Sequence, residues 1–96
     1  MKIPKKIKIG GTTYKVCLTN NISAGNNYNG EILYDDRVIN IRPCESQELT
    51  FLHETVHGIM KMGGYYEHDE QMVEILAQGL LAVIKDNKGL FEENDK

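Results

Sequence analysis

The sequence predicts an α+β fold, a small antiparallel sheet of two hairpins followed by two packed helices. Three observations predict it. Apolar and polar residues alternate in two stretches before Pro43, with the period of a half-buried strand. After Pro43 the apolar residues recur with the period of a helix. Glycine pairs stand where the first hairpin would turn and where the first helix would end.

The two hairpins are expected at 5–18 and 30–42. The first turns at Gly10-Gly11 and the second at Asp35-Asp36, residue pairs that favour turns. Between the hairpins, residues 20–29 are rich in Asn, Ser and Gly, which indicates a loop. The alternating apolar residues that define the strands are Ile7, Ile9, Tyr14, Val16, Leu18, Ile32, Tyr34, Val38, Ile39 and Ile41.

The first helix is expected to begin after Ser46, a residue type that caps helix N-termini, and to end at Gly63-Gly64. The second is expected from about Asp69 to an Asn-Lys-Gly run at 87–89. Each helix has one apolar face that should pack into the core. These faces comprise Leu49, Leu52, Val56, Ile59 and Met60 in the first helix and Val73, Leu76, Ala77, Leu80, Val83 and Ile84 in the second.

Length and composition predict one globular domain over residues 1–96. A net charge of −3 argues against a nucleic-acid partner, and the lysines at 2, 5, 6 and 8 are expected on a solvated strand face. No apolar stretch is long enough to cross a membrane, and no secretory signal follows Met1, so we expect a cytoplasmic protein. No pattern in the sequence indicates an oligomeric state.

Two histidines, His53 and His57, flank Glu54 in the pattern H-E-x-x-H inside the first expected helix. Residues i and i+4 of a helix are neighbours on one face, so both imidazoles can reach a single ion. Zn²⁺ prefers such nitrogen ligands and keeps one position open in catalytic sites. Glu54 is rotated by one residue, beside the metal, where it can take a proton from a zinc-bound water. The pattern therefore predicts zinc as cofactor, His53 and His57 as ligands, and Glu54 as catalytic base.

A catalytic zinc normally has three protein ligands, so one more must come from elsewhere in the chain. Glu74 is the first candidate, because it lies at the edge of the second helix's apolar face, where a carboxylate is costly without a cation opposite. Glu70 lies one turn earlier, but an acidic residue there also suits the helix dipole. His68, just before the helix, is the third candidate. The residues alone favour Glu74 and leave the choice open.

Peptide hydrolysis also needs a group that stabilises the oxyanion of the intermediate. Tyr65, Tyr66 and His68 lie in the connection between the two expected helices and are candidates. Two other functions stay open. The chain could be a zinc-binding interaction or regulatory module without turnover, whose metal supports a small core or an interface. It could also be an interaction protein whose histidines bind no metal.

The motif and its surroundings resemble a known family. The segment His53-Glu54-x-x-His57, the downstream run Val73-Glu74-Ile75-Leu76-Ala77 and the hairpin at 30–41 are similar to small zincin metallopeptidases of the ImmA/IrrE class, of phage or mobile-element type. The resemblance covers residues 28–87. It implies a minimal zincin-like fold that hydrolyses peptide bonds in a specific protein substrate.

The same resemblance implies a gluzincin-like site, with His53 and His57 as ligands, Glu54 as base and Glu74 as third ligand. It also implies that an edge strand at 38–42 holds an extended peptide by strand addition. The chain departs from the fuller consensus of the class around the third ligand, so Glu70 remains an alternative to Glu74.

Overall fold

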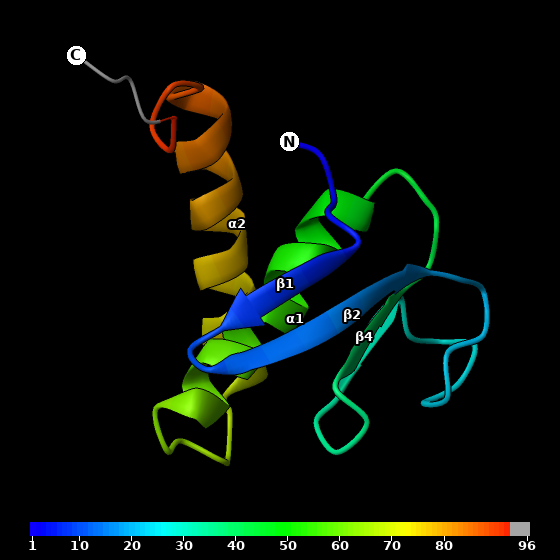
Figure 1. Cartoon of the computed structure of the whole chain (residues 1–96). Coiled ribbons are helices and arrows are strands. Elements are labelled where there is room, and N and C mark those ends of the chain that lie inside the picture. Colours follow the sequence, from blue (N-terminus) through cyan, green and yellow to red (C-terminus); the bar gives the residue numbers. More distant parts are fainter. Residues whose placement is uncertain (93–96) are drawn as a thin grey trace.

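The computed structural model describes residues 1–92, which form a four-stranded sheet and two helices. Figure 1 shows α1 behind the sheet and α2 at its side. The predicted α+β class, with two hairpins followed by two packed helices, is confirmed. The elements are β1 (Lys6–Ile9), β2 (Thr12–Leu18), β3 (Gly30–Leu33), β4 (Val38–Ile41), α1 (Gln47–Met62) and α2 (Glu70–Asp86).

The two hairpins join through a parallel pair, so the sheet is mixed rather than wholly antiparallel. The strand order is β1-β2-β4-β3, with β1–β2 and β3–β4 antiparallel and β2–β4 parallel. A parallel pair needs a crossover of about a dozen residues or more, and the loop at 19–29 together with β3 supplies it. This order places Ile39 and Ile41 at the centre of the sheet, where both are fully buried.

The expectation that residues 38–42 form an edge strand is wrong, because β4 has a neighbour on each side. The edges of the sheet are β1 and β3. The physical reason is burial: β4 offers the apolar Ile39 and Ile41 to the core, whereas β3 begins with Gly30 and Glu31. A short strand with a charged residue suits an edge.

The helix α1 covers the inner face of the sheet at close range. A Cβ atom built on Gly58 would lie 2.8 Å from Cδ1 of Ile9 and 3.2 Å from Cδ1 of Ile32, so glycine is what lets the helix approach here. The core lies between this helix and the sheet, with one residue from α2. Its buried members are Ile9, Tyr14, Val16, Ile39, Ile41, Phe51, Leu52 and Ala77.

The other face of the sheet is polar, as expected for the lysines of β1. Lys6 and Lys8 are exposed there, whereas Ile7 and Ile9 point to the core side. On the same outer face, Glu31 is buried beneath the loop between the hairpins, which it ties to β3 and β4. Its carboxylate accepts hydrogen bonds from the backbone N–H groups of Ser23 and Ala24, both at 2.9 Å, and from Asn40 Nδ2 at 2.8 Å.

Both helices begin and end where the sequence predicted. Ser46 precedes α1, although its side chain makes no capping hydrogen bond, and the N–H of Gly63 donates to the carbonyl of Ile59 at the other end. Asp69 caps α2, since its carboxylate accepts from the N–H groups of Gln71 and Met72. This cap fixes the orientation of the first turn of α2.

The burial predicted for the apolar faces is only partly confirmed. In α2, Val73 and Ala77 are fully buried and Ile84 is partly buried against the core, but the other three predicted core residues are exposed. The reason is that α2 packs against α1 and against no strand of the described chain, so only one stripe of it is covered. The residues wrongly expected in the core are Leu76, Leu80, Val83 and, in α1, Ile59.

The apolar surface of α2 does not make it a membrane span: within residues 1–92, no helix has both the length and the hydropathy that crossing a bilayer requires.

Candidate metal centre

The imidazoles of His53 and His57 converge on the first turn of α2. They stand one turn apart on α1, with ring centroids 5.0 Å apart and ring planes at 63°. Both rings are half-buried, because the neighbouring positions Leu52 and Val56 anchor α1 in the core. The two histidines therefore face one common place, as the H-E-x-x-H pattern predicted.

The group that occupies this place is the carboxylate of Glu70. Its Oε1 lies 3.1 Å from Nε2 of His53 and 3.3 Å from Nε2 of His57, and its Oε2 lies 3.2 Å from the same atom of His57. Among the described residues, His53, His57 and Glu70 are the set whose ligand atoms, all within 4.8 Å of one another, could hold a metal ion.

The distances in this set fit a zinc ion. With ligand bonds of about 2.0–2.1 Å, neighbouring ligand atoms of a tetrahedral zinc site lie about 3.3 Å apart. The two distances from Glu70 Oε1 to the imidazole nitrogens are of that size. Two imidazoles and one carboxylate are also a donor set that catalytic zinc sites use. The residues present are therefore chemically and geometrically suited to the ion.

The expected third ligand, Glu74, contacts the opposite nitrogen of His53. Its Oε1 lies 2.8 Å from His53 Nδ1, and its Oε2 accepts a hydrogen bond from Gln78 Nε2 at 2.9 Å. Hydrogen bonds from Gln78 and His53 lower the pKa of Glu74. A carboxylate in this position orients the imidazole and fixes its tautomer. The geometry thus favours Glu70, the alternative named from the sequence, at the shared position, and Glu74 as its support.

The third candidate, His68, lies on the far side of His57. The two Nδ1 atoms are 2.6 Å apart and the rings stack with centroids at 4.9 Å, while Nε2 of His68 faces the backbone carbonyl of Tyr65. Burial lowers the pKa of His57, and the nearby carboxylate of Glu70 offsets part of that effect. A lowered pKa keeps His57 neutral near pH 7, the form that binds metals.

The side chain of Glu54 lies beside the start of the edge strand β3. It is only 8% exposed. A Cβ on Gly30 would lie 3.5 Å from Cγ of Glu54 and would collide with Thr50 at 2.5 Å, so glycine lets β3 begin beside this carboxylate. Burial raises the pKa of Glu54 to about 7; Glu70 and Glu31 add to the rise and His53 opposes it.

A residue absent from the predicted site, Tyr34, lies beside the cluster. Its hydroxyl is 3.5 Å from the carbonyl oxygen of His57, and its ring lies under Nζ of Lys61 at 4.9 Å. Burial and, secondly, the charge of Glu54 raise the pKa of Tyr34 to about 12, so it remains a proton donor. In the sequence, Tyr34 fits the alternating apolar pattern of a strand and was therefore assigned to the core. Its hydroxyl, at the end of the strand, was the feature that could have marked it as a candidate site residue.

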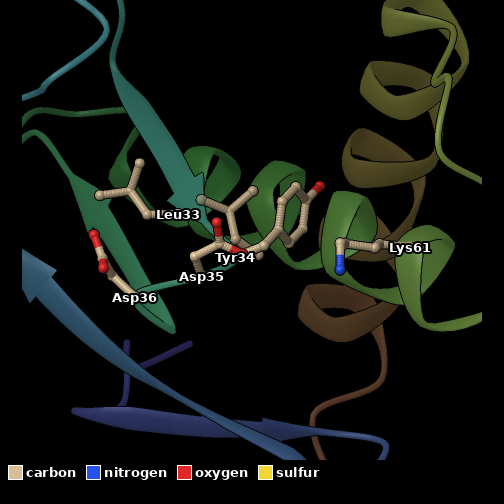
Figure 2. Close-up of a pocket in the computed structure, with 6 residues that line it drawn as sticks. Leu33, Tyr34, Asp35, Asp36 and Lys61 are labelled. Atoms are coloured by element: carbon tan, nitrogen blue, oxygen red, sulfur yellow. The ribbon is translucent and has the colours of Figure 1, made fainter.

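Two cavities lie beside Tyr34, next to the histidine cluster, and Tyr34 and Lys61 line both of them. Figure 2 shows the larger one, of about 400 Å³, between the β3–β4 turn and the end of α1. The smaller, of about 230 Å³, is also lined by Tyr66 and His68. The surface is therefore hollowed from the turn at Asp35 to the histidine cluster. Tyr65 and Tyr66, two of the expected oxyanion donors, are 65% and 72% exposed.

Comparison of the chain with protein-family models, curated proteins and solved structures found no match. The resemblance to the ImmA/IrrE class therefore stays a prediction, and the functional argument stands on the residues themselves.

Proposed function

We propose that this chain is a zinc metallopeptidase that hydrolyses peptide bonds in a specific protein substrate. The main support is one arrangement: Glu70 bridges the Nε2 atoms of His53 and His57, while Glu54 is buried next to them on the same helix. Two neutral imidazoles, a carboxylate and a separate base are the parts that zinc-dependent hydrolysis requires.

In this proposal His53, His57 and Glu70 hold the ion. Glu74 orients His53 through Nδ1, and His68 does the same for His57. When bound, zinc supplies a Lewis acid that polarises a carbonyl and lowers the pKa of water to about 7.

Glu54 moves the protons. It accepts one from the water that attacks the peptide carbonyl carbon and donates it to the amide nitrogen as the C–N bond breaks. Burial raises the pKa of its carboxyl, which favours taking up the proton and holding it until the amide nitrogen receives it. The hydroxyl of Tyr34 lines the hollow beside the cluster and is the donor we assign to the oxyanion.

The substrate would lie along β3. This strand is an edge of the sheet, so it has backbone N–H and C=O groups free to pair with an extended peptide. Its first residue, Gly30, lies beside Glu54, and its end opens into the cavity at Tyr34 and Lys61. Strand addition here replaces the role first expected for residues 38–42.

The experiment that tests this function is Glu54→Gln, assayed with unfolded casein and a mixed-sequence quenched-fluorescence peptide pool. We expect cleavage to fall by about a thousandfold or more, with one zinc per chain retained, because the amide cannot take the proton. Glu45→Gln, an exposed carboxylate before α1, is the matched control and should cleave normally. Equal cleavage by wild type and Glu54→Gln would refute the proposed mechanism.

One observation supports the alternative of a zinc-binding module without turnover. The cluster links α1 to α2, and α2 has no other partner element in the described chain. An ion there would hold the helix pair together whether or not catalysis occurs. This alternative predicts no cleavage by wild type and a loss of stability in His53→Ala, so the same assays separate the two functions.

A further inference from the structure

Lys61 lies on α1 one turn beyond His57, on the face that carries the two histidines. Residues i and i+4 of a helix are neighbours, and one such step advances about 6 Å along the helix axis. Within residues 1–92 it is the only lysine that is half-buried, whereas the other lysines are exposed. The helix therefore holds a cationic side chain next to the candidate metal centre.

Two aromatic rings, and no carboxylate, contact this ammonium group. Its Nζ lies 4.9 Å from the ring centroid of Tyr34 and 6.0 Å from that of Tyr66, distances at which the face of a ring attracts a cation. None of the ion pairs among the described residues includes Lys61. The rings hold the charge in place without neutralising it, so the ammonium group is free to pair with an anion.

The smaller of the two cavities places this charge in a recess beside the histidines. Its volume is about 230 Å³, and it is lined by Tyr34, Lys61, Tyr66 and His68. Most small-molecule sites take roughly 300–1,000 Å³, so a recess of this size suits a single side chain. Both ring nitrogens of His68 are engaged, one by His57 and the other by the backbone carbonyl of Tyr65. None of the described lining residues is acidic, so the polar groups left to a ligand are one cation and two hydroxyls.

The acidic residues of the β3–β4 turn lie on the other side of Tyr34. Asp35 and Asp36 line the larger cavity together with Lys61, and in the view of Figure 2 the ring of Tyr34 lies between them and Lys61. Both aspartates are exposed, so solvent and salt screen their charges. An anion is therefore favoured beside Lys61 and disfavoured further along the cavity, near the turn.

We propose that Lys61 binds a carboxylate of the substrate in this recess, so that the chain prefers peptides with an acidic group close to the cleaved bond. The inference rests on the proposed metallopeptidase function and names its substrate class. The hydroxyl of Tyr34, assigned to the oxyanion, lines the same recess. The step of about 6 Å from His57 to Lys61 spans about two residues of an extended peptide. The carboxylate therefore belongs to an Asp or Glu within about two positions of the cleaved bond, or to a C-terminus equally close.

The cleavage test uses a mixed-sequence peptide pool in two forms, with free and with amidated C-termini, and mass spectrometry to locate the cuts. We expect Asp and Glu to be favoured about tenfold over Asn and Gln at one position near the cut. A side-chain carboxylate gives this preference in both pools. A C-terminal carboxylate instead gives cuts near the peptide end, in the free pool only.

Variants of Lys61 test whether its charge sets the preference. Lys61→Met should remove the preference, Lys61→Arg should keep it, and Lys61→Glu should reverse it toward Lys and Arg. Lys8→Met, which removes an exposed lysine of β1, is the matched control and should keep the wild-type preference. A lysine in the last turn of α1 also suits the helix dipole. If that were its whole role, Lys61→Met would lower the melting temperature and leave the preference unchanged, which would overturn the proposal.

A binding test separates this proposal from the metallopeptidase function. The full chain carrying Glu54→Gln, with zinc, is dialysed against the same pools, and the retained peptides are identified. We expect acidic peptides to be retained about tenfold better than their Asn and Gln counterparts, and Lys61→Met added to Glu54→Gln to remove the difference. Acid-selective binding with no cleavage by wild type would refute the metallopeptidase function and leave the carboxylate site. Cleavage with no acid preference would refute the carboxylate site alone.

Discussion

At the scale of single residues, the candidate site depends on which nitrogen each carboxylate meets. Glu70 lies at Nε2 of both histidines, and Glu74 lies at Nδ1 of His53 alone. A helical wheel puts the two glutamates on one side of α2 and cannot separate these roles. Their difference arises from the crossing of α2 over α1, which brings the first turn of α2 between the two rings.

This difference predicts the order of two variants. Glu70→Ala should weaken zinc binding more than Glu74→Ala, because it removes a ligand rather than a support; the loss of an outer-shell partner typically costs about 10–100-fold in affinity. The measurement is competition for zinc with a chromophoric chelator at pH 7. Glu67→Ala, an exposed residue of the same connection, serves as control. The reverse order would restore Glu74 as the third ligand, as first expected from the sequence.

At the scale of elements, the connection between the hairpins decides the sheet order. Residues 19–29 cross the end of the sheet and are fixed by the buried carboxylate of Glu31. Burial alone would raise the pKa of Glu31, but hydrogen bonds from Asn40, Ser23 and Ala24 outweigh it and lower the pKa below 4.5. The ionised form of Glu31 therefore stabilises the loop, β3 and β4 together.

A lowered pKa in the folded state sets the sign of the pH dependence. The contribution of Glu31 is complete above about pH 4.5 and is lost as the pH falls through its folded-state pKa. We expect Glu31→Gln to lose about 1–3 kcal/mol of unfolding free energy at pH 7, and the difference from wild type to shrink in acid.

Urea unfolding at several pH values measures this difference, with a chelator present throughout so that metal release does not contribute. Glu45→Gln is the control for a solvent-exposed carboxylate. A wild-type advantage that stays constant from pH 7 to pH 3 would contradict the role given to the charge of Glu31.

At the scale of the whole molecule, the metal centre and the helix pair depend on each other. The helix α2 joins the rest of the described chain through its packing on α1, where Val73 and Ala77 are fully buried, and the contacts of Glu70 and Glu74 with His53 add polar links between the same two helices. A small domain has little stability to spare, and an ion that binds only the folded state adds to it.

We therefore expect zinc to raise the melting temperature. At a free zinc concentration one hundred times the dissociation constant, the gain is about 2.7 kcal/mol, which is of the order of 10–20 °C for a domain of this size. Thermal unfolding with added zinc and with a chelator measures it. His53→Ala should show no such shift, and a shift equal to that of wild type would place the ion elsewhere.

Local patterns in the sequence were sufficient to predict the helices and strands and to place two histidines on one face of α1. Period-2 and period-3.6 patterns with glycine turns located both hairpins and both helices, and H-E-x-x-H brought His53 and His57 to one face, because these features are local in the chain. Local patterns also made Glu54 available on the neighbouring face. None of these required knowledge of a distant contact.

The features that depend on contacts between distant residues could not be predicted from local patterns. The packing of the two hairpins pairs β2 with β4 in parallel and makes β3 an edge strand. The packing of α2 on α1 places Glu70 rather than Glu74 at the shared Nε2 position and leaves Leu76 and its neighbours exposed. The end of β3 brings Tyr34 to the cluster. Each outcome follows from how elements cross and stack. Residue spacing within one element carries no information about that geometry.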